Sequence, residues 1–155
     1  MEKEQLKRIF EFLEEKEQRN PPFLWKHMND MPLTKEELDV IGDLDLINAP
    51  ITSLPKGLKV GGNLDLRRTK ITSLPEGLYV GGTLYLAYTK IASLPEGLEV
   101  RGWLDIIETN ITSLPKGLKV HASLDMARTE LTKYTDDELR KMIKPGFIKG
   151  KINRR

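Results

Sequence analysis

The chain has 155 residues, the size of one ordinary domain, and its 39% hydrophobic and 31% charged residues indicate a soluble, folded protein. A formal net charge of +2 gives no overall reason to expect a nucleic-acid or membrane partner. There is no cysteine, which excludes disulfides and a cysteine nucleophile; with no long apolar segment and a charged N-terminus, we expect a cytoplasmic location.

Residues 1–30 are predicted to form an N-terminal helical cap. Within residues 2–19, four apolar side chains recur at helical spacing, namely Leu6, Ile9, Phe10 and Leu13. Pro21-Pro22 ends this helix, and an apolar cluster follows at Phe23, Leu24, Trp25 and Met28. Thr34 is a plausible N-cap of a further short helix, with Glu37 three residues on.

A twenty-residue repeat dominates the rest of the chain. Four units follow one another without insertion or deletion, beginning at Ile51, Ile71, Ile91 and Ile111. A degenerate unit precedes them, in which Leu38, Val40, Gly42, Leu44 and Leu46 have the same phase. Such a period predicts a solenoid. We expect five turns of the chain, or coils, over residues 31–130, with units 31–50, 51–70, 71–90, 91–110 and 111–130.

The pattern inside each unit predicts how a coil folds. Leu64-Asp65-Leu66 alternates apolar and polar side chains, as a half-buried strand does, and Leu58-Lys59-Val60 is a shorter alternation. Gly61-Gly62 between them indicates a tight bend or a left-handed backbone position. Pro75 and Gly77 in the Leu-Pro-x-Gly arc exclude a helix there. Stacked coils of this kind share one core.

The segment Leu64-x-Leu66-x-x-Thr69-x-Ile71 resembles the strand-and-turn segment of leucine-rich repeats, with Thr where that family usually has Asn. The Thr-Ser-Leu-Pro sequence is similar to the short bacterial subclass, and Gly-Gly-x-Leu-x-Leu to repeat proteins of bacteria and their phages. The resemblance covers residues 31–130. It implies a predominantly β, five-coil leucine-rich-repeat solenoid with parallel strands, and says almost nothing about function.

One column of threonines accompanies the repeat, formed by Thr69, Thr89, Thr109 and Thr129. We predict that their hydroxyls bond to backbone groups at the turn, as Asn side chains do elsewhere in the family. The alternative is that a β-branched residue is simply favoured beside a strand.

Residues 131–155 are predicted to form a C-terminal helical cap and a basic tail. Thr135-Asp136-Asp137-Glu138 has the character of a helix start, and the helix would present Leu139, Met142 and Ile143 to the last coil. It should end before Pro145-Gly146, and Phe147-Ile148 should fold back onto it. The basic tail that follows contains Lys149, Lys151, Arg154 and Arg155. At both ends, helices that dock a partner are the alternative to caps.

Residues between the inward leucines should point outward, and stacking should align them in columns across one sheet face. The residues of this face that we predict to bind a partner are Asp45, Asp65, Arg67, Tyr85, Tyr88, Trp103, Asp105 and Asp125. An exposed Trp beside Tyr is typical of interface hot spots; alternatively, Trp103 packs over the glycine-rich bend. The aspartates either match a basic partner or are repeat consensus, with Arg67 and Arg68 offsetting part of their charge.

Catalytic chemistry has no candidate residues. The two histidines, His27 and His121, lie far apart in the sequence, no phosphate-binding Gly-x-x-x-x-Gly-Lys segment occurs, and no pocket is predicted around the aspartates. We therefore expect no enzyme activity, no metal, no cofactor and no small-molecule substrate.

Three functional hypotheses remain. The first is a monomeric protein-protein interaction module that binds a partner on the sheet face; the resemblance to phage and bacterial repeats suggests a modulator of a host protein. The second is nucleic-acid binding through the basic segment Arg140–Arg155, and the third is a structural component that assembles through its caps.

Overall fold

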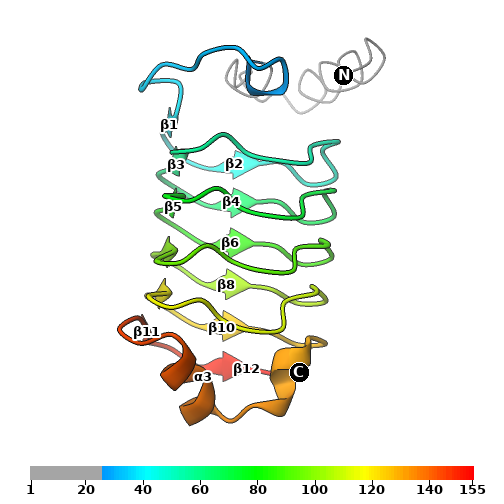
Figure 1. Cartoon of the computed structure of the whole chain (residues 1–155), viewed down its shortest axis with the longest axis vertical. Helices are drawn as coiled ribbons and strands as arrows, with labels where there is room; N and C mark the ends of the chain where they lie inside the picture. Colours follow the sequence, from blue (N-terminus) through cyan, green and yellow to red (C-terminus); the bar gives the residue numbers. More distant parts are fainter. Residues whose placement is uncertain (1–25) are drawn as a thin grey trace.

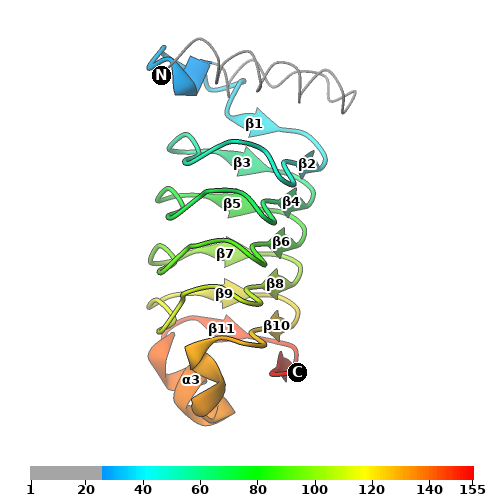
Figure 2. The same ribbon diagram turned by 90° about the vertical axis from the view of Figure 1, so that its right-hand side faces the viewer.

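The computed structural model describes residues 26–155, so the helix predicted over residues 2–19 and the cluster at residues 23–25 lie outside the described residues. The described chain is predominantly β and winds into a solenoid of parallel strands (Figure 1). The strands form two sheets on adjacent sides of the stack, and each sheet has six strands (Figure 2). Within residues 26–155, no helix is long and apolar enough to cross a membrane.

Each strand is only two residues long. The first sheet contains β1 (Asp39–Val40), β3 (Lys59–Val60), β5 (Tyr79–Val80), β7 (Glu99–Val100), β9 (Lys119–Val120) and β11 (Phe147–Ile148). The second contains β2 (Leu44–Asp45), β4 (Leu64–Asp65), β6 (Leu84–Tyr85), β8 (Leu104–Asp105), β10 (Leu124–Asp125) and β12 (Ile152–Asn153).

Residues twenty apart in the sequence are neighbours across the strands. Leu64 pairs with Leu84, and Leu84 with Leu104, while Asp65 pairs with Tyr85 and Tyr85 with Asp105. The degenerate unit keeps this register, because Leu44 pairs with Leu64. The predicted alignment of the coils is therefore confirmed, and with it the existence of columns on the sheet face.

The inward-pointing leucines of each Leu-x-Leu segment fill the core. Leu64, Leu66 and Val60 have no exposed surface, and their equivalents in the neighbouring coils are buried in the same cluster. Burying one such side chain contributes roughly 1.5–3 kcal/mol. Because each coil supplies only a few of these side chains, the core exists only when coils stack.

The glycine pairs permit contact between backbones. The Gly82 N–H donates to the Gly62 carbonyl at 2.8 Å, and a Cβ on Gly82 would lie only 2.8 Å from the Gly62 carbonyl carbon. In the Gly-Gly pairs neither glycine is left-handed; left-handed glycines lie in the Leu-Pro-x-Gly arc, as at Gly77 with φ +76°, and at Gly42 of the degenerate unit, with φ +89°. Of the two alternatives for the glycine pair, the tight bend is therefore the one observed.

The threonine column bonds to the backbone as predicted. Thr89 is 3% exposed, and its hydroxyl donates to the Leu86 carbonyl at 2.7 Å. Thr69, Thr109 and Thr129 donate in the same way to the carbonyl three residues earlier, at 2.8, 2.8 and 2.6 Å. These hydroxyls satisfy carbonyls at the turn that water does not reach.

A short 3-10 helix, η1 (Glu130–Lys133), and a helix, α3 (Asp136–Met142), follow β10. The Thr135 hydroxyl accepts from the Glu138 N–H at 3.2 Å, and the Glu138 carboxylate accepts from the Thr135 N–H at 2.7 Å, which completes a capping box. Leu139 and Ile143 have no exposed surface and join the core.

The chain beyond α3 differs from the prediction. Phe147 and Ile148 do not fold back onto the helix as an isolated apolar pair; they form β11, which pairs with β9. β12 then pairs with β10. The physical reason is visible in the spacing, because Ile148-x-Gly150-x-Ile152 repeats that of Val60-x-Gly62-x-Leu64, and Gly150 packs closely on the Ala122 backbone.

The helix predicted after Thr34 is also absent. Thr34 and Glu37 exchange both hydrogen bonds of a capping box, at 2.9 and 3.2 Å, but residues 35–38 form a turn. Strand β1 begins at Asp39, directly after this turn, and leaves no room for a helix.

Replacing Thr89 by Val tests the threonine column. Thr89→Val keeps the shape but removes the donor to a buried carbonyl, so we expect the free energy of unfolding to fall by about 1 kcal/mol in chemical denaturation. The control Thr72→Val changes an exposed threonine of the same unit and should shift it by less than about 0.5 kcal/mol. Equal effects of the two substitutions would contradict a role for the buried hydroxyl.

Deleting residues 146–155 tests the contribution of β11 and β12. Because Ile148 is 2% and Ile152 9% exposed, their loss should lower the free energy of unfolding by about 3 kcal/mol or more, measured by thermal unfolding. Arg155→Ala, at the exposed end of the same segment, is the control and should leave the transition unchanged. A truncated chain that unfolds at the original temperature would show that these strands contribute nothing.

Candidate binding surface

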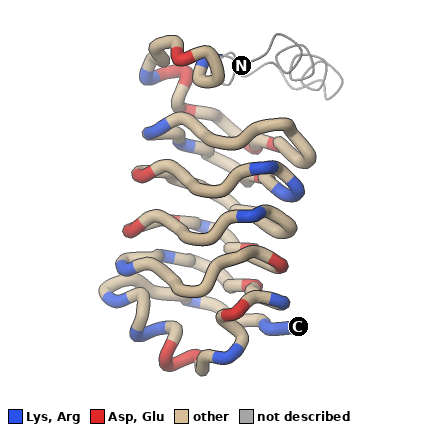
Figure 3. The backbone as a smooth tube through the Cα atoms, turned by 45° about the vertical axis from the view of Figure 1, so that its right-hand side comes forward, with Lys and Arg blue, Asp and Glu red and all other residues tan. Residues whose placement is uncertain are grey.

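The outward residues of the second sheet, together with those of the turn that follows each strand, are called the sheet face below. Its first column contains Asp43, Asn63, Thr83, Trp103 and Ser123, and its second Asp45, Asp65, Tyr85, Asp105 and Asp125. Positions of both charge signs are spread along the stack (Figure 3). The sheet face therefore has no single charge along its length.

The first column is a ladder of hydrogen bonds from backbone to side chain. The Asn63 N–H donates to the Asp43 carboxylate at 2.6 Å, and the Thr83 N–H donates to the Asn63 side-chain oxygen at 2.7 Å. The Trp103 N–H donates to the Thr83 hydroxyl at 3.2 Å. Near the C-terminus, the Lys151 N–H donates to the Ser123 hydroxyl at 3.1 Å. Side-chain oxygens at this position thus link each coil to the next, which the sequence analysis missed.

Trp103 interrupts this ladder. An indole has an N–H donor and no acceptor, so Trp103 cannot receive the N–H of the next coil as its neighbours in the column do. Its side chain is 52% exposed. Packing over the bend therefore leaves half of this large side chain at the surface.

The aspartates of the second column hold the turn after the strand. Asp105 accepts from the Ile107 N–H at 3.0 Å, and the same bond to the residue two positions on is made by Asp45, Asp65 and Asp125, at 3.0, 3.1 and 3.3 Å. Short polar side chains commonly cap a backbone N–H in this way. The repeated Asp thus has a structural role, and Tyr85 is the member of the column that cannot perform it.

Arg67 neutralises one of the aspartates. Its Nη2 lies 2.5 Å from Asp65 Oδ2 and its Nε 2.9 Å from Oδ1, and the guanidinium carbon lies 4.9 Å from the centre of the Tyr85 ring. The bond to Asp65 raises the pKa of Arg67. Asp65 was expected to be outward and solvated, but Arg67 covers it and it is 8% exposed. Arg68 lies instead over the Tyr88 ring, at 5.4 Å.

Asp105 and Asp125 lie opposite each other across β8 and β10. Among the described residues, neither has a cation within ion-pair distance. Desolvation by burial raises the pKa of Asp105 above its ordinary value, and the negative charge of Asp125 adds to this rise. The two carboxylates therefore form a pair of like charges without a direct ion pair, and the charge of Arg67 opposes part of the rise in the pKa of Asp105.

Tyr88 occupies a left-handed turn position. Its φ is +63°, and this conformation is shared by its equivalents in the other coils, Asn48, Arg68, Glu108 and Arg128, with φ between +54° and +59°. Left-handed backbone is unfavourable for side chains other than Gly, Asn and Asp by about 1–2 kcal/mol. Tyr88 is nevertheless aromatic and 50% exposed, at the edge of the sheet face.

A shallow depression lies beside Arg67 at the N-terminal end of the sheet face. Its volume is about 280 Å³, and its lining includes Asp43, Asp45, Asp65 and Tyr85. The sheet face thus has relief but no enclosed pocket at this point.

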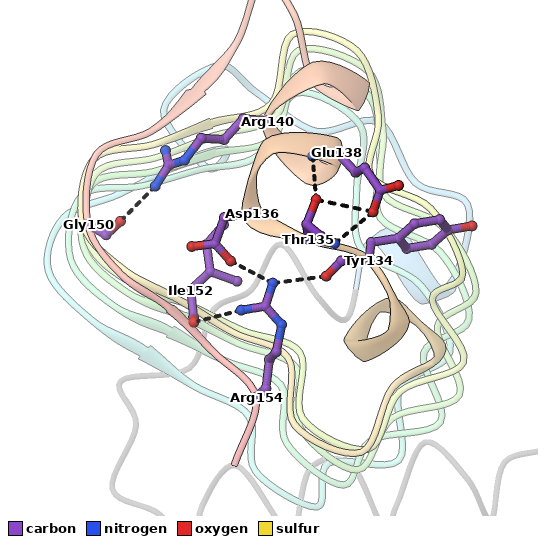
Figure 4. A network of polar contacts seen from close by, with 8 residues as sticks. All are labelled: Tyr134, Thr135, Asp136, Glu138, Arg140, Gly150, Ile152 and Arg154. Carbon is purple, nitrogen blue, oxygen red and sulfur yellow. Dashed lines mark hydrogen bonds and ion pairs between the residues drawn. The ribbon is translucent and has the colours of Figure 1, made fainter.

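Several of the C-terminal basic residues hold the end of the chain in place. Arg154 donates to the Tyr134 carbonyl at 3.0 Å and pairs with Asp136 at 2.6 Å, and Arg140 donates to the carbonyls of Ile148 and Gly150 (Figure 4). Lys149, Lys151 and Arg155 are exposed. Arg154 is therefore engaged within the protein, while the other three predicted tail residues have side chains at the surface.

The histidines occupy separate environments. His27 Nε2 lies 3.0 Å from the Ser53 hydroxyl, and His121 Nε2 lies 3.0 Å from Glu99. Burial lowers the pKa of His27, and Asp30 opposes this shift. Within residues 26–155, no cluster of three or more His, Asp or Glu side chains could hold a metal ion.

No protein-family model matches this chain, and neither a curated protein nor a solved structure matches it.

Asp105→Asn tests the like-charge pair. Asn keeps the oxygen that accepts from Ile107 and removes one charge, so at neutral pH the free energy of unfolding should rise by about 0.5 kcal/mol. A carboxyl whose pKa is raised by folding destabilises the folded state above that pKa. The advantage of Asp105→Asn should therefore shrink as pH falls toward 3.8, the ordinary value.

The measurement is chemical denaturation of both proteins across this pH range. Asp137→Asn, a matched substitution on α3 outside the sheet face, is the control and should show no such pH-dependent gain. An advantage of Asp105→Asn that is constant with pH, or grows toward acid, would contradict the charge repulsion.

Proposed function

We propose that the chain is a non-catalytic protein-protein interaction module that binds its partner on the sheet face, around Tyr85, Tyr88 and Trp103. One observation carries the proposal. In two columns where the other described side chains accept a backbone N–H, the two residues that cannot do so are both aromatic, Tyr85 and Trp103.

These two residues are close together. Tyr85 pairs with Asp105, two residues after Trp103, and the Leu84 N–H donates to the Trp103 carbonyl at 2.9 Å. Tyr88 follows Tyr85 at the edge of the same face and, like Trp103, is half exposed, whereas Tyr85 is less exposed. Aromatic side chains of this kind dominate the energetics of protein interfaces. Three aromatic residues at positions where the fold favours small or polar ones support selection for binding.

Finer features of the proposal rest on the sequence. We assign the repeat to the leucine-rich-repeat class, with five coils over residues 31–130 and helices that cap both ends. The Gly-Gly-x-Leu-x-Leu pattern supports an origin in bacteria or their phages and a role as a cytoplasmic, monomeric modulator of a host protein.

Exchange of residues between coils provides a test that spares the fold. Trp103→Ser introduces the residue found at position 123 of the same column, and Tyr85→Asp introduces that found at positions 65 and 105. We expect the double variant to lose capture of a specific partner from native host lysate, since truncating a hot-spot residue commonly weakens binding by about 2 kcal/mol or more.

Tyr79→Lys is the matched control. It removes a tyrosine from the other sheet and introduces the residue that stands at positions 59 and 119. This variant should retain capture, and all variants should keep the cooperative thermal unfolding of the original chain. If the folded double variant still captures the partner, the sheet face is not the binding surface.

A further inference from the structure

At one place on the sheet face, an arginine side chain contacts both a carboxylate and an aromatic ring. Arg67 contacts Asp65, two residues before it, and covers the Tyr85 ring on the next coil. Both contacts are favourable, because a guanidinium bonds strongly to a carboxylate and is attracted to an aromatic face. The sheet face can therefore hold a guanidinium group between a carboxylate and an aromatic ring.

An aspartate and an exposed aromatic ring also occur further along the stack, in a different arrangement and without an arginine between them. Asp105 corresponds to Asp65, but the position two residues on is Ile107 rather than an arginine. On the next coil the corresponding position is Ala127, which is 7% exposed. Trp103 supplies an exposed ring two residues before Asp105, on the same side of the strand.

Negative charge is in excess around Asp105 and Asp125. Asp105 and Asp125 pair across adjacent strands, and among the described residues neither forms a direct ion pair, although the charge of Arg67 acts on Asp105 from beyond ion-pair distance. Arg128, three residues after Asp125, lies 3.3 Å from Glu108 and is compensated there. A cationic group placed between Asp105 and Asp125 would be attracted by both carboxylates and would contact the Trp103 ring.

We propose that the partner inserts an arginine side chain of a basic segment beside Trp103, between Asp105 and Asp125. This inference rests on the proposed function and narrows it, since it names the chemistry of the partner. Arginine fits better than lysine because its planar guanidinium can bond to a carboxylate and stack on an indole at the same time. The guanidinium then offsets the cost of burying Asp105 and the repulsion between the two carboxylates.

The probe is the peptide acetyl-Ala-Arg-Ala-amide, titrated into the isotopically labelled full chain at low ionic strength and followed by NMR. We expect shifts of the Trp103 indole N–H, assigned with Trp103→Ser, and of the Ile107 and Ala127 backbone N–H groups that Asp105 and Asp125 accept. The citrulline analogue has the same shape without the charge, and should bind about fivefold more weakly or not at all.

Three variants locate the site. Asp105→Asn with Asp125→Asn keeps both acceptor oxygens and should weaken the arginine peptide about fivefold or more. Glu76→Gln with Glu96→Gln removes the same charge from the exposed Leu-Pro-x-Gly arc and should leave its affinity unchanged. Ile107→Arg recreates the Asp65–Arg67 pair on this coil and should block the peptide, because the site is then filled from within.

Each contrary outcome is informative. Equal binding of the citrulline peptide, unchanged affinity in the double Asp variant, or preferential binding of acetyl-Ala-Glu-Ala-amide would overturn the arginine site. If partner capture still depends on Trp103 and Tyr85 but not on Asp105 and Asp125, the arginine inference fails while the proposed function stands. If capture depends neither on the two aromatic residues nor on the two aspartates, the arginine inference and the proposed function both fail.

Discussion

Hydrogen bonding between successive coils at a constant twenty-residue spacing is the constraint on which the structure depends. Leu66 donates to the Tyr85 carbonyl at 2.9 Å, Leu86 to that of Asp105 at 2.8 Å, and the same bond recurs along the second sheet. With strands of only two residues, no strand is stable alone, and stability comes from neighbours on either side. Any residue that keeps the coils close together is therefore required by the fold.

This requirement explains what the sequence predicts well. Val60, Leu64 and Leu66 are buried because their spacing matches the strand period, and the Thr89 hydroxyl is a second donor, beside its own N–H, to the Leu86 carbonyl. Such features repeat from unit to unit, and repetition makes them visible in one sequence. The segment at Ile148 and Ile152 was missed because α3 interrupts the period before the spacing resumes.

The candidate site was predictable only in part. Asp65, Tyr85 and Asp105 were expected to align, and they pair in that order. The contact of Arg67 with both Asp65 and Tyr85 was not foreseen, because it depends on the conformation of a long side chain rather than on strand alternation. The role of Asp43, Asn63 and Thr83 as acceptors was also missed, since these residues share an oxygen atom but no obvious sequence pattern.

In a repeat protein, the neighbouring coils are an internal reference for every position. Where most members of a column bond to the backbone, a residue that cannot do so gives up a stabilising contact, so its retention calls for another reason. Trp103 and Tyr85 meet this criterion in two separate columns, and Tyr88 is a half-exposed aromatic residue at the edge of the same face. Tyr85 and Trp103 lie on adjacent coils of one face, and a chance scatter of surface residues would not place the two departures together. The repeat therefore separates residues kept for stability from those kept for binding.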